Sequence, residues 1–328
     1  MRSKKIQNIT IAIISTVITT STILLATELS GRSIIMPLWY LKVERFGDAE
    51  IGIWQDDPVL GWVHKPNSKG NHFKPLTHNV TYQIDEHGHR ITEGEYSLPK
   101  ILFLGGSFTF GHGVEDNEPF PSLLQEKYPQ YKIINAGVMA WGTGQALLKL
   151  REQLTSNNDI KLVVYAFTTY HLERNYLRQS WLKSMEEFGQ KRNPYFEIID
   201  GELVFKGLAD PDKNGITDEE YLQHMEREMT LKMLEEMKKL CDASSIPFVF
   251  IYLPDGLKFE LSPEDISAIV GSEFFYDLRK EIDYAQIRFK YDVHPTARGH
   301  LLIAQSVEPI LQKLLFETDF SVLQKSFK

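Results

Sequence analysis

The sequence predicts an α/β fold in which helices cover both faces of a central parallel sheet. From Lys100 onward, short apolar runs alternate with amphipathic segments of helical period, the pattern of strands joined by crossover helices. The runs are nearly continuously apolar, as expected of strands that are buried on both faces. With 328 residues and 42% hydrophobic content, the chain is large enough to bury a substantial core.

Each element follows from its own stretch of sequence. Strands are expected at 100–105, 131–137, 161–167 and 247–253, and helices at 119–128, 142–154, 218–241 and 296–315. Residues 176–216 are less regular and are expected to form an insertion. Residues 44–99 carry several prolines and glycines and one β-like run at 79–84, so we expect strands and loops that pack on the main domain.

Charge and cysteine content exclude several classes of protein. Lys and Arg total 36 against 44 for Asp and Glu, a net charge of −8, which argues against nucleic acid as a partner because phosphate binding needs a basic surface. Cys241 is the single cysteine, so neither an internal disulfide nor a cysteine-based zinc site is possible. Its place in a helical stretch is typical of a packing residue.

The N-terminus predicts a membrane anchor. Arg2, Lys4 and Lys5 precede an uncharged stretch from Ile6 to Thr27, which is long enough to cross a bilayer as a helix. The positive-inside rule then places the rest of the chain outside the membrane. A cleaved signal peptide is the alternative and would give a secreted protein, but the residues before the end of this stretch match a cleavage site poorly.

Four regions are therefore expected along the chain. They are a cytoplasmic stub and transmembrane anchor at 1–30, a juxtamembrane segment and preamble at 31–99, the α/β domain at 100–316, and a C-terminal tail at 317–328.

Two loops carry residues suited to nucleophilic catalysis. Ser107 follows the first strand in a glycine-rich turn, where a backbone can bend and present its N–H groups to a ligand. Asp292 and His294 precede the last helix, and a nucleophilic serine needs a base whose other ring nitrogen is held by an acid. Taken singly, the first loop could be an incidental turn and the second a turn or a metal-ligand pair.

In combination these motifs resemble the SGNH/GDSL hydrolases, in the membrane-anchored bacterial branch of that family. The matching segments are GGSFTFG from Gly105 to Gly111, Asn135-Ala136-Gly137 with the stretch that follows it, and Asp292 with His294 before Pro295. The resemblance covers roughly Pro58 to Leu315 and includes the preamble. It implies a flavodoxin-like, three-layer α/β/α sandwich that needs no cofactor and no metal.

The resemblance also implies roles for individual residues. Ser107 would be the nucleophile, His294 the base and Asp292 its orienting acid, and the N–H groups of Ser107 and Gly137 would contribute to the oxyanion hole. The sequence departs from the family at Gly106, where the family has Asp, and after the third strand, where the family's Asn donor is missing. His171 is the candidate substitute, with a histidine bonded inside its own loop as the alternative, and Thr169 and Asn175 are further candidates.

Structural roles are favoured for most of the remaining histidines. His87 and His89 lack an acidic or cysteine partner at ligand spacing, so a surface turn is favoured over a metal pair. His112 adjoins the serine loop and either lines the site or packs beside it, and His300 is expected to be structural.

The sequence therefore predicts a serine-dependent esterase, or an acyl transferase, on the outer side of a bacterial inner membrane. The expected partners are an acylated small molecule or glycan as substrate and the membrane through the N-terminal helix. The alternative is a non-catalytic protein of the same fold that binds or assembles envelope polysaccharide.

Overall fold

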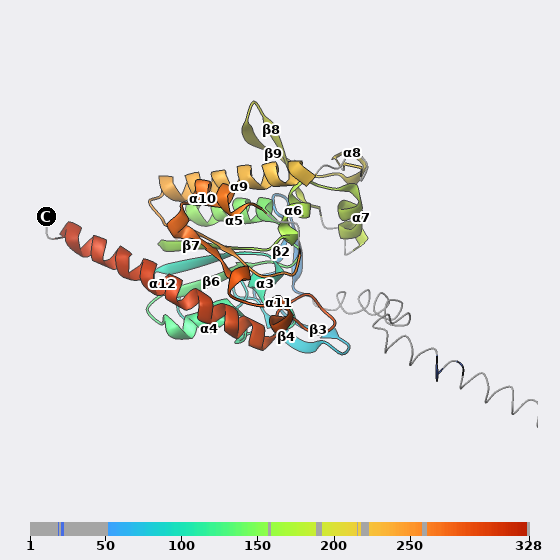
Figure 1. Cartoon of the computed structure of the whole chain (residues 1–328), viewed down its shortest axis with the longest axis horizontal. Coiled ribbons are helices and arrows are strands. Elements are labelled where there is room, and N and C mark those ends of the chain that lie inside the picture. Colours follow the sequence, from blue (N-terminus) through green and yellow to red (C-terminus); the bar gives the residue numbers. More distant parts are fainter. Residues whose placement is uncertain are drawn as a thin grey trace, which may run out of the picture. The chain divides into compact units, whose positions relative to one another are not determined.

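The computed structural model describes residues 19, 21–22, 52–156, 159–187, 192–214, 216–217, 223–257 and 261–326. One compact unit extends from Ala49 to Lys328 (Figure 1). The predicted anchor at Ile6–Thr27 lies outside the described residues, apart from three positions. In the part of the chain that is described, no helix combines the length and the apolar character needed to cross a membrane.

Five parallel strands form the central sheet, in the order β11-β10-β7-β5-β6. They are β5 (Lys100–Gly105), β6 (Lys132–Gly137), β7 (Ile160–Phe167), β10 (Phe248–Tyr252) and β11 (Phe275–Asp277). Numbered along the chain, this is the 2-1-3-4-5 order of flavodoxin-like sheets. The prediction of a parallel α/β sheet is confirmed, and the carboxyl ends of β5 and β7 meet where the strand order reverses, which is where such sheets bind ligands.

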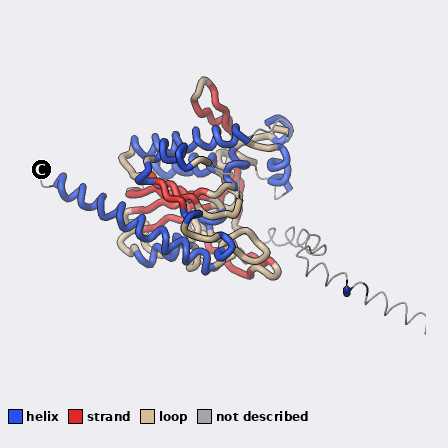
Figure 2. Tube along the Cα trace, in the orientation of Figure 1, coloured by secondary structure: helices blue, strands red, loops and turns tan. Residues whose placement is uncertain are grey.

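Helices cover both faces of the sheet, as Figures 1 and 2 show. One face carries α5 (Thr143–Thr155), α9 (Gln223–Ala243) and α10 (Pro263–Val270), and the other carries α4 (Phe120–Lys127) and α12 (Ala297–Ser326). Along β5, Leu102 and Leu104 point into the first core while Ile101 and Phe103 point into the second. This double burial explains why the strands are apolar at every position.

Short elements complete the unit. They are the helices α3 (Ser107–Phe110), α6 (Tyr170–Asn175), α7 (Gln179–Glu187), α8 (Pro211–Asn214) and α11 (Tyr284–Ile287), and the 3₁₀ turns η2 (Ser272–Phe274) and η3 (Leu278–Lys280). The predicted insertion contains α7, α8 and the antiparallel pair β8 (Pro194–Ile199) and β9 (Glu202–Leu208). The predicted boundary at 316 falls inside α12.

The preamble forms two antiparallel pairs that pack against the sheet domain. They are β1 (Trp54–Asp57) with β2 (Gly61–His64), and β3 (Lys69–Lys74) with β4 (His78–Gln83). The indole N–H of Trp62, on β2, donates to the carbonyl of Met139 at 3.1 Å, and the indole N–H of Trp141 donates to the carbonyl of Trp62 at 3.0 Å. Because both rings are only 1% exposed, this segment shares the core of the sheet domain.

Candidate active site

The first strand of the sheet delivers Ser107 to the carboxyl edge. β5 ends at Gly105, and Ser107 is the first residue of α3, where backbone N–H groups have no acceptor within the helix. The helix lasts a single turn because Gly111 ends it at φ 86°, in the left-handed region. The serine side chain is thus held at a fixed point on the edge of the sheet.

Ser107, His294 and Asp292 form a continuous hydrogen-bonded chain. The Ser107 hydroxyl donates to His294 Nε2 at 2.7 Å, and His294 Nδ1–H donates to Asp292 Oδ1 at 2.5 Å. The backbone N–H of His294 also donates to Oδ1, at 2.8 Å, so the carboxylate fixes both the ring and its loop. The structure brings together the three residues that the sequence paired, although Ser107 and His294 are 187 positions apart.

A buried lysine from the preamble completes the chain. Lys74, the last residue of β3, donates from Nζ to Asp292 Oδ2 at 2.7 Å, and the side chains of Lys74 and Asp292 are 10% and 3% exposed. Burial alone would raise the pKa of Asp292. The hydrogen bond from His294, the electrostatic interactions with the His294 and His112 rings, and the positive charge of Lys74 together outweigh burial and hold the pKa of Asp292 well below its usual range. Asp292 is therefore ionised, and both of its oxygens are occupied.

Two further side chains fix the turn that carries the serine. Arg90 is fully buried and donates to the carbonyls of Phe110, Gly111 and Val114, as well as to Asp116. Asn135, on β6, donates from Nδ2 to Thr109 O at 2.9 Å. The carbonyls at the end of a helix lack partners within it, so these donors hold the end of α3 in place.

No protein-family model and no curated protein sequence matches this chain. Solved structures that match it include AlinE4, a SGNH-hydrolase family esterase, with 17% identity over 68% of this chain and 99% of that chain and a TM-score of 0.36. The esterase EstA from Pseudoalteromonas sp. has 14% identity over 69% of this chain and 98% of its own, with a TM-score of 0.34. The acetyl xylan esterase Est2A from Butyrivibrio proteoclasticus has 11% identity over 70% of this chain and 68% of its own, with a TM-score of 0.40.

AlinE4 is described as a SGNH-hydrolase family esterase, and this is the family that the motifs of this sequence resemble. Identities and TM-scores at this level assign no activity to this chain.

The N–H of Gly137, a predicted oxyanion donor, already has a hydrogen-bond partner in this structure. It donates to Asn135 Oδ1 at 3.1 Å, and a Cβ added at Gly137 would stand 2.4 Å from the backbone nitrogen of Phe110. The side chain of Asn135 thus holds the turn that carries Ser107, and the absence of a side chain at Gly137 lets the backbone of this strand lie against the backbone at Phe110. The contribution of the Ser107 and Gly137 N–H groups to an oxyanion hole stays a prediction: Ser107 N–H lies at the start of α3, and Gly137 N–H would have to leave Asn135 Oδ1 to bind an oxyanion.

His171 lies beside the serine loop. A Cβ added at Gly106 would stand 2.7 Å from His171 Nε2, which explains why glycine occupies this position. The ring is 1% exposed, and burial followed by the charge of Arg174 lowers its pKa well below the ordinary value, so the imidazole is neutral. Its Nδ1 lies 2.8 Å from the hydroxyl of Tyr165, which donates in turn to Thr143 Oγ1 at 2.9 Å.

This network bears on the predicted role of His171 as an oxyanion donor. A hydroxyl has one proton, so while Tyr165 donates to Thr143 it can only accept from His171 Nδ1–H. Nε2 is then an acceptor. Donation to an oxyanion requires Tyr165 to turn its proton from Thr143 to Nδ1.

The other candidate residues have structural partners. Asn175 Oδ1 accepts the N–H groups of Thr143 and Gly144 at the start of α5, and Thr169 N–H donates to Asp255. His89 is buried, with its Nδ1 2.9 Å from the hydroxyl of Tyr96, rather than lying in a surface turn as predicted. His300 is fully buried on α12 and accepts the N–H of Phe120, as its predicted structural role requires.

Among the described residues, one cavity lies beside the loops that follow β10 and β11. It has a volume of about 430 Å³, and its lining includes Asp255, Arg279 and Tyr284. The hydroxyl of Tyr284 donates to the carbonyl of Val293, the residue between the acid and the base, so this cavity adjoins the triad loop.

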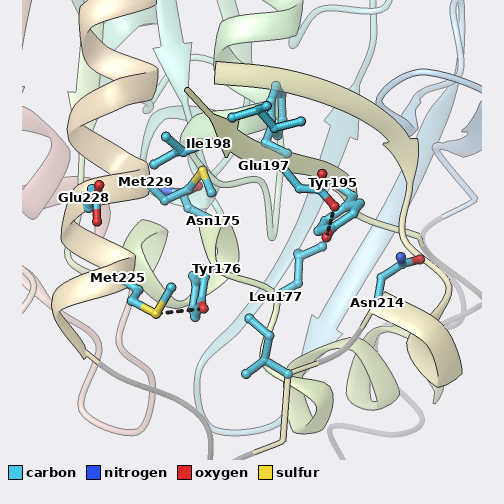
Figure 3. A pocket seen from close by; sticks show the side chains of 13 residues that line it. Asn175, Tyr176, Leu177, Tyr195, Glu197, Ile198, Asn214, Met225, Glu228 and Met229 are labelled. Atoms are coloured by element: carbon cyan, nitrogen blue, oxygen red, sulfur yellow. Dashed lines mark hydrogen bonds between the residues drawn. The ribbon is translucent and has the colours of Figure 1, made fainter. Parts of the chain in front are cut away.

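The second cavity, of about 530 Å³, lies between the β8–β9 pair and α9 (Figure 3). Its lining includes Tyr176, Met225 and Met229 but none of the triad residues.

Sequence reasoning did not find Lys74 or Arg90. A lysine and an arginine in irregular, polar sequence are normally solvated, and their partners lie elsewhere in the chain. The one available signal was the resemblance of the preamble to the family's own, which suggested that this segment belongs with the domain.

Proposed function

We propose that this protein is a serine-dependent ester hydrolase. The observation that carries the proposal is the hydrogen-bonded chain from Ser107 through His294 to Asp292, at 2.7 and 2.5 Å. In this arrangement His294 Nε2 takes the serine proton as Oγ attacks the ester carbonyl, and Asp292 stabilises the imidazolium that forms.

The reaction then proceeds through an acyl-enzyme. Collapse of the tetrahedral intermediate breaks the ester bond, and His294 gives its proton to the leaving alcohol. Water, activated by the same ring, attacks acyl-Ser107, and the carboxylic acid leaves as the serine regains its proton. If a sugar hydroxyl takes the place of water, the same steps transfer the acyl group. The N–H of Ser107 faces the developing oxyanion, and His171 is the candidate for a second donor.

The proposed substrate is an O-acylated glycan, and the 430 Å³ cavity beside the triad loop supports this choice. Its lining combines carboxylates, Arg279, Lys280 and a tyrosine, groups that can form hydrogen bonds with sugar hydroxyls. The uncharged stretch from Ile6 to Thr27, behind Arg2, Lys4 and Lys5, supports anchoring in a bacterial inner membrane with the α/β domain outside. Envelope or secreted glycans are found on that side.

A non-catalytic binding protein is the second candidate, and a specific observation favours it. Gly137 N–H is bound by Asn135, and His171 Nδ1 is bound to Tyr165, so the oxyanion site has fewer free donors than the sequence predicted. A protein of this kind would bind the acylated glycan and leave the ester intact.

A fluorophosphonate probe separates the two candidates, because it reacts only with an activated serine. Wild-type protein and the Ser97→Ala control, which alters an exposed serine, should be labelled, whereas Ser107→Ala should not. Release of acetate from an acetylated oligosaccharide should follow the same pattern. Absence of labelling in the folded wild-type protein would exclude the hydrolase and leave the binding protein.

A further inference from the structure

Three histidines gather beside the triad on its preamble side. His72 lies on β3, His78 on β4 and His112 in the loop after α3, and one ring nitrogen of each is within 4.8 Å of the other two. His72 and His78 are 1% and 8% exposed, and His112 is partly buried. The three ring planes meet at 68°, 78° and 87°, so the rings present edges to one another rather than stacking. The arrangement thus brings one nitrogen from each of three rings into a single cluster.

Hydrogen bonds within the cluster do not satisfy all of its nitrogens. His72 Nδ1 lies 2.8 Å from the hydroxyl of Tyr82 and 3.1 Å from His78 Nε2. A ring nitrogen carries either one proton or one lone pair in the ring plane, so it cannot serve both neighbours fully. The competition arises between the nitrogens that face each other, His72 Nδ1 and His78 Nε2. An additional group between these two nitrogens would relieve it.

We propose that His72, His78 and His112 bind one divalent transition-metal ion of the zinc class. Two ligands at ~2.0–2.1 Å in tetrahedral geometry lie ~3.3 Å from each other, close to the 3.1 Å between His72 Nδ1 and His78 Nε2. Imidazole nitrogen is a preferred ligand of Zn²⁺, Ni²⁺ and Cu²⁺. Three protein ligands leave the fourth position to water, as in other zinc sites with three protein ligands.

The surroundings of the cluster suit a metal of moderate affinity. His72 and His78 are buried and hydrogen-bonded, so their rings are held in place rather than free to turn in solvent. The nearest negative charge is Asp292, which Lys74 and His294 share. We therefore expect tighter binding than at exposed histidines but weaker binding than at a site with its own carboxylate.

A second possible group, His112 with Asp292 and His294, is less suitable. The rings of His112 and His294 stack at 4.0 Å with planes 28° apart, so their lone pairs do not converge. Both oxygens of Asp292 are already bound. An ion at the three-histidine site would instead join the β3–β4 pair, which carries Lys74, to the loop that follows the serine helix.

The test is metal binding, and it does not depend on catalytic activity. Full-length chain freed of metal by a chelator is titrated with Co²⁺ and, separately, with Zn²⁺ in a calorimeter. We expect one equivalent of Co²⁺ with the visible absorption of four-coordinate geometry, and a zinc-dependent rise in Tm that the chelator reverses. His72→Gln and His78→Gln should each lose the absorption and weaken binding at least tenfold. His87→Gln and His224→Gln, which alter exposed histidines, should bind as the wild type does.

The outcomes decide the proposal in either direction. It is overturned if the wild type shows no four-coordinate Co²⁺, or if folded His72→Gln and His78→Gln keep the signal. Loss of the signal in His294→Ala alone would also overturn it, because the ion would then sit on the triad. Should the glutamine variants not fold, anomalous scattering from crystals of zinc-soaked wild type locates the ion directly, and density away from the three rings refutes the site.

Discussion

Replacing Lys74 with Met tests how the preamble acts on catalysis. Methionine keeps much of the length of the side chain but removes the ammonium that lies 2.7 Å from Asp292 Oδ2. The carboxylate keeps both donors from His294, so the loss is one charge-assisted hydrogen bond in a buried site, about 2–3 kcal/mol of unfolding free energy. At about 2 °C per kcal/mol for a domain of this size, Tm should fall by about 4–6 °C.

The effect on rate should exceed the effect on binding. With Oδ2 released, Asp292 can turn and carry the His294 ring away from Ser107, and misplacement of a catalytic group by ~1 Å costs up to about 10²-fold in rate. We expect kcat for p-nitrophenyl acetate to fall about 10- to 100-fold with little change in KM. Lys69→Met is the matched control, since Lys69 is exposed on the same strand.

A double-mutant cycle shows whether Lys74 acts through Asp292. In an Asp292→Asn background, Lys74→Met should lower kcat by less than twofold, because the group that it positions is already changed. Equal losses in both backgrounds, or a single variant that keeps more than half of the wild-type kcat, would refute the reasoning.

Two further predictions concern the serine loop and a buried carboxyl. Gly106→Ala should lower Tm, because its Cβ would stand 2.7 Å from His171 Nε2. Adding His171→Ala should relieve much of that loss of stability by removing the clash. Thermal melts of the single and double variants check this, and an unaffected single variant would contradict it. Burial raises the pKa of Glu226 to about 7, so the stability that its neutral form provides is complete below about 4.5 and is lost as pH rises through 7. Glu226→Gln should match the wild-type Tm near pH 4 and exceed it near pH 8. Glu228→Gln, at an exposed position, should not change Tm relative to wild type at either pH. A pH-independent difference between Glu226→Gln and wild type would refute the assignment.

The sequence predicted the sheet well because each long strand is buried on both faces. Lys100–Gly105 and the later runs are apolar at nearly every position, and that pattern needs no knowledge of neighbours. β11 was missed because its three residues, Phe275–Asp277, are too few to form an apolar run, and their pairing with β10 gives them their structure.

The site was predictable only where chemistry leaves a local pattern. Ser107, Asp292 and His294 stand in short motifs, whereas Lys74 is 218 positions from its partner and has no motif of its own. The availability of Gly137 N–H depends on the rotamer of Asn135, which no sequence pattern specifies. Burial of three histidines side by side depends on the pairing of β3 with β4 and on where α3 ends.

The long separations within the site have a consequence for how the chain folds. Contacts between residues far apart in sequence require closure of large loops, and such contacts tend to form late. Ser107 must meet His294 across 187 positions, and Asp292 must meet Lys74 across 218. A nascent or partly folded chain therefore contains Ser107 but not the proposed catalytic arrangement. The proposed esterase activity, followed during refolding, would report completion of the whole unit rather than formation of its helices.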